Sequence, residues 1–181
     1  MLVPTGRSVS TSTMSETPEG ASMTQLLRGL LVGAAAGAAG TTALNAATYL
    51  DMVIRARPAS STPEKSVEKL ADVVGVTIPG DEKQRSHRVA GLGPMLGIAT
   101  GVGVGVLVGG ARAAGIRSGG VVGTLLTTGV VLVASNAPMT LLKVTDPRRW
   151  SITDWVSDVL PHLAYGIVTH ATAVAADDPA R

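Results

Sequence analysis

The sequence WSITDWVSDVLPHLAYGIVTHATAVA, residues 150–175, sets the fold class of this chain. It is mainly apolar over the ~20 residues that a helix needs to cross a membrane, yet it contains two carboxylates, two histidines and a tyrosine inside that length. Polar groups within a membrane span are costly unless they face other helices or water. We therefore expect residues 155–175 to be one of several packed spans, with their polar side chains turned inward.

The composition of the whole chain supports a membrane protein. Hydrophobic residues make up 45% of the 181 residues and charged residues only 15%. The charges are gathered in blocks, with long uncharged runs between them, whereas a soluble helix carries charge on its wet face at nearly every turn. The formal net charge of +2 is too small to indicate a nucleic-acid partner. The chain has no cysteine, so it has neither disulfides nor thiolate metal ligands.

Three further apolar runs predict three more spans, at residues 26–50, 89–111 and 121–142. Residues 1–22 are rich in Ser, Thr, Gly and Pro and are expected to form a disordered tail, and residues 177–181 form a second, short tail. Residues 23–176 are then a single membrane domain. The fold class that follows is all-α: a four-helix transmembrane bundle, with a short amphipathic helix in the first loop.

That short helix is predicted from Thr62 to about Val74. Thr62 and Pro63 form a good helix start, and apolar residues then recur on one face. It is expected to lie on the membrane surface or to dock under the spans.

Glycines at four-residue spacing occur in the first and second spans. Such rows let two helix backbones approach closely in lipid, so we expect the two rows to face each other; they are Gly29, Gly33 and Gly37, and Gly97, Gly101, Gly105 and Gly109.

The last span carries the candidate polar site. At 100° per residue, Asp154, Asp158, His162 and Tyr165 fall within an arc of roughly 80°, with His170 further round; Asn136 and Asn45 are polar residues of other spans that could join them. Three interpretations compete: structural hydrogen bonds, a proton or cation path through Asp158 and His162, and a metal site. The structural interpretation is preferred. A metal site is only weakly indicated, because its candidate ligands lie on one helix and no second cluster of ligands accompanies them. At the end of the first span, Asp51 and Arg55 are spaced to pair at the membrane boundary.

The distribution of Lys and Arg predicts the orientation. The first and third loops hold ten of these residues, and the segments assigned to the other side of the membrane hold five. By the positive-inside rule, the first and third loops are cytoplasmic and both termini lie outside the cell membrane.

The pattern W-S-x-x-D-W-x-x-D-x-x-P-H-x-x-Y-G over residues 150–166, together with Tyr49-Leu50-Asp51 and Arg57-Pro58-Ala59-Ser60-Ser61, resembles uncharacterised actinobacterial multi-pass membrane proteins. The resemblance implies a four-span inner-membrane protein and no established activity.

Taken together, the sequence favours a small, non-enzymatic integral membrane protein without cofactor or metal. Its expected role is that of a helix-packing scaffold or accessory subunit, in a homo-oligomer or a larger membrane complex. The alternative is a proton- or cation-coupled carrier that uses Asp158 and His162.

Overall fold

The computed structural model describes residues 18–177, with side chains described from Ser22 onward. This part of the chain is all-α, and its helices are α1 (Pro18–Arg55), α2 (Thr62–Val73), α3 (Glu82–Ala113), α4 (Gly120–Leu141) and α5 (Ile152–Ala176), with a short 3-10 turn, η1 (Pro147–Arg149), before α5. The predicted all-α class and the short helix in the first loop are both confirmed. Most of the two predicted tails, residues 1–17 and 178–181, lies outside the described residues.

Four of these helices are long and apolar enough to cross a membrane: α1 from Ser22 onward, α3, α4 and α5. The shortest of them has 22 residues, which at ~1.5 Å per residue covers a hydrocarbon core of ~30 Å. On length and composition, the chain is that of a multi-pass membrane protein.

Two helices begin earlier than the sequence predicted. α1 starts at Pro18 rather than at residue 26, so residues 18–22, which were expected in the N-terminal tail, lie at the start of this helix. Pro18 at the start of the helix is consistent with this early start, because Pro is favoured in the first helical turn. α3 starts at Glu82 rather than at residue 89, because Asp81 and Gln84 form a reciprocal capping box.

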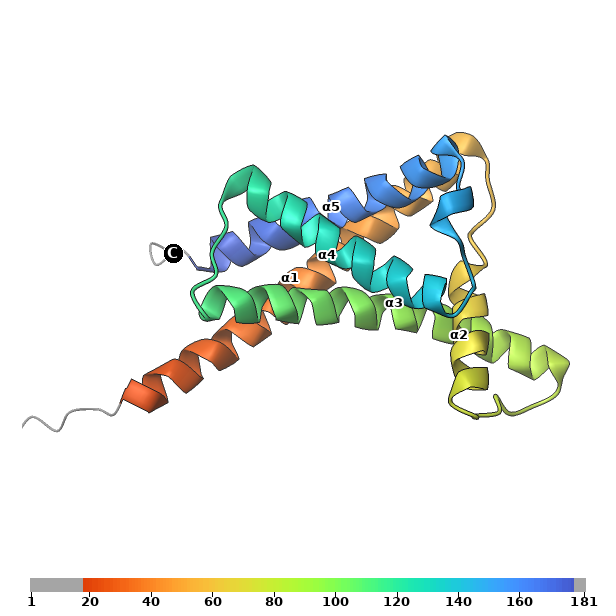
Figure 1. The fold of residues 1–181 in the computed structure, drawn as a ribbon, viewed down its shortest axis with the longest axis horizontal. Helices are drawn as coiled ribbons and strands as arrows, with labels where there is room; N and C mark the ends of the chain where they lie inside the picture. The colour runs from red at the N-terminus through yellow and green to blue at the C-terminus, as the bar shows by residue number, and fades with distance from the viewer. Residues whose placement is uncertain (1–17, 178–181) are drawn as a thin grey trace, which may run out of the picture.

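Figure 1 shows how the helices are arranged. α1 crosses α3, α5 runs alongside the C-terminal half of α1, and α4 packs on α5. α2 lies across the N-terminal half of α3, at the end of the bundle where α4 finishes and α5 begins. The start of α1, the turn between α3 and α4 and the end of α5 lie at the opposite end, which we call the termini end; the end that carries α2 is the α2 end.

The crossing of α1 and α3 is a contact between glycine backbones. A Cβ added to Gly29 would meet the Gly109 carbonyl oxygen, and one added to Gly37 would meet that of Gly101. Gly33 and Gly105 lie against each other in the same way. The two rows therefore meet as the spacing predicted, with one exception. Gly97 lies outside this contact, because a Cβ there would have no atom of another residue within 4 Å.

The helices α2, α3 and α4 end in the same pair of backbone hydrogen bonds, in which the residue after the cap is left-handed. α1 ends with one bond of this kind, from Arg57 N–H to the Met52 carbonyl at 3.3 Å, and its left-handed residue is Ala56. In α4, Lys143 N–H donates to the Thr140 carbonyl at 3.0 Å and Val144 N–H to the Met139 carbonyl at 2.9 Å, the Schellman pattern. The left-handed position is occupied by Gly75 after α2, Gly115 after α3, Ala56 after α1 and Lys143 after α4. Glycine is the usual residue there because it has no Cβ.

Candidate functional site

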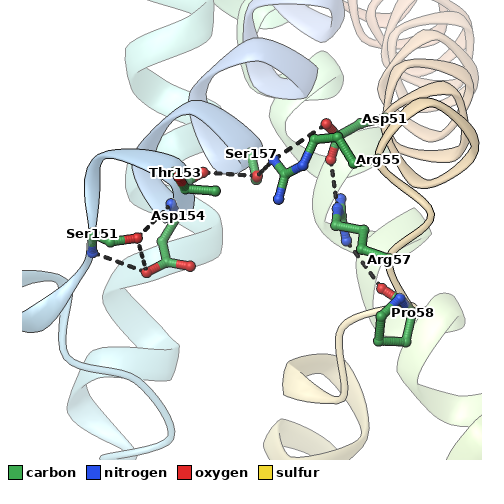
Figure 2. Close-up of polar contacts among 8 residues, drawn as sticks. All are labelled: Asp51, Arg55, Arg57, Pro58, Ser151, Thr153, Asp154 and Ser157. Atoms are coloured by element: carbon green, nitrogen blue, oxygen red, sulfur yellow. Dashed lines mark hydrogen bonds and ion pairs between the residues drawn. The ribbon is translucent and has the colours of Figure 1, made fainter.

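The start of α5 is fixed by Ser151. Its hydroxyl accepts from the Asp154 backbone N–H at 3.2 Å, and the Asp154 carboxylate accepts from Ser151 N–H at 2.9 Å and from its hydroxyl at 2.7 Å (Figure 2). Trp150 and Trp155 pack edge to face beside this turn, with ring centroids 4.9 Å apart. Asp154 is exposed and is engaged in this cap. Asp154 therefore makes a structural hydrogen bond at the helix start, as the preferred interpretation of the stripe expected, and it does not face the other spans.

Asp158, one turn further along, contacts α4. Asn136 donates from Nδ2 to Asp158 Oδ2 at 2.9 Å. The Nδ1 atom of His162 lies 3.5 Å from the other carboxylate oxygen, and the Asp158 and His162 side chains are only 20% and 11% exposed. These residues, which the sequence placed on different spans, form one polar contact between α4 and α5.

His162 connects Asp158 to Ser135. Its Nδ1 lies 2.7 Å from the Asp158 backbone carbonyl, which can only accept, so Nδ1 carries the proton in the neutral ring. Its Nε2 then accepts from the Ser135 hydroxyl at 3.3 Å. The sequence did not include Ser135 in the site; its position next to Asn136 was the available signal. We call Ser135, Asn136, Asp158 and His162 the α4–α5 cluster.

Tyr165 is fully buried and bonds to a third helix. Its hydroxyl donates to the Gly101 carbonyl of α3 at 2.6 Å. Its ring and the Thr169 hydroxyl lie over Gly40 of α1, where a Cβ would meet both. Tyr165 therefore joins α5 to α1 and α3, away from the α4–α5 cluster.

His170 is buried against α4. A Cβ added to Gly123 would meet its ring, and its Nε2 has no hydrogen-bond partner within residues 22–177. A similar contact occurs nearby, where the Thr128 hydroxyl lies over Gly166. Glycines thus accommodate polar side chains of neighbouring helices at several crossings, a role that four-residue spacing does not predict for Gly40, Gly123 or Gly166.

Asp51 has partners of its own at the α2 end. Its carboxylate pairs with Arg57 at 2.5 Å and with Arg55 at 3.4 Å, the spacing-predicted pair. Arg55 also donates to the Ser157 hydroxyl of α5 at 2.6 Å, so the group connects α1 to α5 (Figure 2). Asn45, half buried on α1, makes no hydrogen bond to the α4–α5 cluster within the described chain. The polar residues of the spans are therefore divided among several contacts.

At the termini end, Arg112 of α3 donates twice to Asp177, at 2.7 and 3.0 Å. Arg28 of α1 donates to the Ala176 carbonyl at 3.4 Å. Both arginines therefore anchor the end of α5 to the other two helices.

Within residues 22–177, no group of three or more His, Asp, Glu or Cys side chains is placed to hold a metal ion. Two surface cavities lie at the α2 end, of about 350 and 570 Å³, and neither is lined by Asp158 or His162.

No family model matches the chain, and comparisons with curated proteins and with solved structures find no match. The actinobacterial resemblance therefore stays a prediction from the sequence. What the four long apolar helices establish is a multi-pass membrane protein.

Proposed function

We propose that this protein is a non-enzymatic membrane protein that acts through lateral association of its helices. The partner is a second copy of the chain or a larger membrane complex in which it is an accessory subunit. The observation that carries the proposal is the separate use of its intramembrane polar groups. Tyr165 bonds to Gly101 between α5 and α3, Asp158 bonds to Asn136 between α5 and α4, and Arg55 bonds to Ser157 between α1 and α5, so each lies at a different helix contact.

A carrier needs these groups to gather around a single water-filled route. In this bundle they are occupied in holding helices together, which supports a rigid structural unit. The outward surface fits association in lipid as well. Large apolar side chains cover it, and a Cβ added to Gly97 or Gly129 would meet no neighbouring residue. Small residues facing lipid let another helix approach closely.

Fluorescence energy transfer between copies in liposomes tests self-association. The chain has no native cysteine, so Ala59→Cys in the exposed first loop carries a single donor or acceptor dye. Transfer that persists as the lipid-to-protein ratio rises supports a dimer or larger oligomer. Gly97→Leu is expected to reduce the transfer if α3 forms the contact, and Gly103→Leu, on another face of α3, is the matched control. Energy transfer no higher than that expected for randomly distributed molecules would exclude self-association. The protein would then act only as an accessory subunit of a larger complex.

The carrier is retained as the second candidate because of one observation, the chain from Ser135 through His162 to Asp158. It combines a titratable imidazole with a carboxylate, and both side chains keep some exposure. Purified protein in liposomes with an enclosed pH-sensitive dye and an imposed pH gradient decides between the two candidates. We expect proton flux equal to that of empty liposomes. A proton flux above that of empty liposomes, if the Asp158→Asn variant abolished it, would overturn the scaffold proposal.

We also propose that the α2 end faces the cytoplasm. The described Lys and Arg residues are concentrated there, on α2, on the first turns of α3 and around η1, and the positive-inside rule places such loops in the cytoplasm.

A further inference from the structure

An open surface cavity of about 350 Å³ at the α2 end is lined in part by cationic side chains from three separate elements. Lys65 and Lys69 come from α2, Arg85 from the start of α3 and Lys143 from the turn after α4. Two carboxylates, Glu68 and Asp72, complete its charged lining. The lining therefore has two positive charges in excess.

The lysines are the available charges. Arg85 pairs with Glu68 at 3.2 Å, which neutralises both. Lys65, Lys69 and Lys143 form no ion pair or hydrogen bond through their ammonium groups with any residue from 22 to 177. Three cations with no anionic partner around one hollow indicate an anionic ligand.

The position of the cavity indicates the source of that anion. α2 lies across α3 (Figure 1), and Pro63 and Glu64 at its start pack against Gly93. Leu70 and Val73 of α2, and Val74 just after it, are exposed. An amphipathic helix with unpartnered apolar residues beside the end of a membrane bundle lies at the level of the lipid headgroups. Basic pockets in that position bind anionic headgroups.

Lys143 reaches the cavity from a third element, the turn after α4. It occupies the left-handed position with φ 56°, where α2 and α3 have glycine. A side chain in that conformation is strained relative to glycine, as it is at Ala56 after α1. Here it places an ammonium group at the edge of the cavity.

We propose that this cavity binds the phosphate headgroup of an anionic phospholipid, with Lys65, Lys69 and Lys143 as its ligands. The site does not depend on the proposed scaffold role, and its test is separate from the association and flux measurements.

The test is native mass spectrometry of the full-length protein in detergent, titrated with phosphatidylglycerol. Phosphatidylcholine with the same acyl chains provides the zwitterionic comparison, and soluble glycerol phosphate provides the same phosphate without a membrane. We expect phosphatidylglycerol to bind most tightly. The variant K65Q/K69Q/K143Q should weaken that binding by about 100-fold, on the order of a few-fold to tenfold for each cation lost. The control K83Q/R148Q/R149Q removes three cations from the same end of the bundle but none from the cavity.

Equal losses in the two triple variants would show a diffuse surface attraction and overturn the proposal. If soluble glycerol phosphate bound as tightly as phosphatidylglycerol, the conclusion that the ligand is a lipid headgroup would be overturned.

Two single variants distinguish a loss of the lipid site from a loss of folding. Asp72→Asn removes a competing carboxylate and is expected to tighten phosphatidylglycerol binding severalfold. Lys143→Gly should raise resistance to unfolding, because it relieves the left-handed residue, while it weakens lipid binding. Ala56→Gly relieves the same conformation after α1, away from the cavity, and should leave lipid binding unchanged. Unchanged binding in both Asp72→Asn and Lys143→Gly would contradict the site.

Discussion

The Tyr165 hydroxyl donates to the carbonyl oxygen of Gly101 at 2.6 Å, across the interface between α5 and α3. The Tyr165 ring is completely buried, and it lies over Gly40 of α1 on the way to this bond. One side chain thus joins three of the four spans. Its position depends on two glycines, one that leaves room for the ring and one whose carbonyl is exposed to the hydroxyl.

Removal of this bond should destabilise the bundle measurably. Tyr165→Phe keeps the ring over Gly40 and deletes only the hydroxyl, so the expected loss in free energy of unfolding is about 0.5–1.5 kcal/mol, as for interhelical hydrogen bonds in membranes. Unfolding by SDS in mixed micelles measures it. Tyr49→Phe is the control, since Tyr49 is 62% exposed. An equal effect in the two variants would show that the Tyr165 bond adds nothing.

The glycine crossing of α1 and α3 should reject even one methyl group. In Gly105→Ala, the new Cβ would meet the Gly33 carbonyl and the Gly37 backbone. We expect destabilisation of about 1–3 kcal/mol, because the two helices must move apart. Gly97→Ala, eight residues earlier on the same helix, adds the methyl in open space and should be neutral or stabilising by up to about 1 kcal/mol through helix propensity. The same SDS titration compares them, and a neutral Gly105→Ala would contradict the close backbone contact.

The two histidines of α5 should respond in opposite ways to an apolar replacement. His162→Leu removes the partner of Ser135 and leaves Asp158 with Asn136 alone, so a loss of about 1–3 kcal/mol is expected. His170→Leu removes an imidazole whose buried Nε2 has no partner in the described chain, and an apolar group of similar size there should be neutral or stabilising. SDS unfolding of both variants checks the contrast. A large loss for His170→Leu would show that its ring has a role beyond packing on Gly123.

The orientation can be tested with single cysteines at the two ends of the bundle. Ala59→Cys lies in the exposed loop at the α2 end, and Ala114→Cys lies in the exposed turn at the termini end. With a membrane-impermeant maleimide, Ala114→Cys should react in intact cells, and Ala59→Cys should react only in inverted vesicles. The reverse pattern would place the α2 end outside and contradict the orientation inferred from the distribution of Lys and Arg.

The number and approximate position of the spans could be predicted from the sequence because hydropathy is a local property. An apolar run of about 20 residues has to be shielded from water whichever helix it contacts. The four-residue glycine spacing was informative for a similar reason, since it creates a flat face on an isolated helix before any partner is present. The contact of Gly29, Gly33 and Gly37 with the second row follows from such faces.

The partners of the polar side chains were decided by the tertiary structure alone. Helical periodicity placed Asp154, Asp158, His162 and Tyr165 on one stripe of α5, but the neighbouring helices cross that stripe at different heights. Asp154 therefore lies at the helix start, Asp158 and His162 contact α4, and Tyr165 contacts α3. Gly97 faces outward for the same reason, because the contact of the α3 glycine row with α1 ends at Gly101, which lies against Thr41. The rotation and the crossing angle of each helix result from the packing of all the helices together. The periodicity of a single helix therefore cannot predict them.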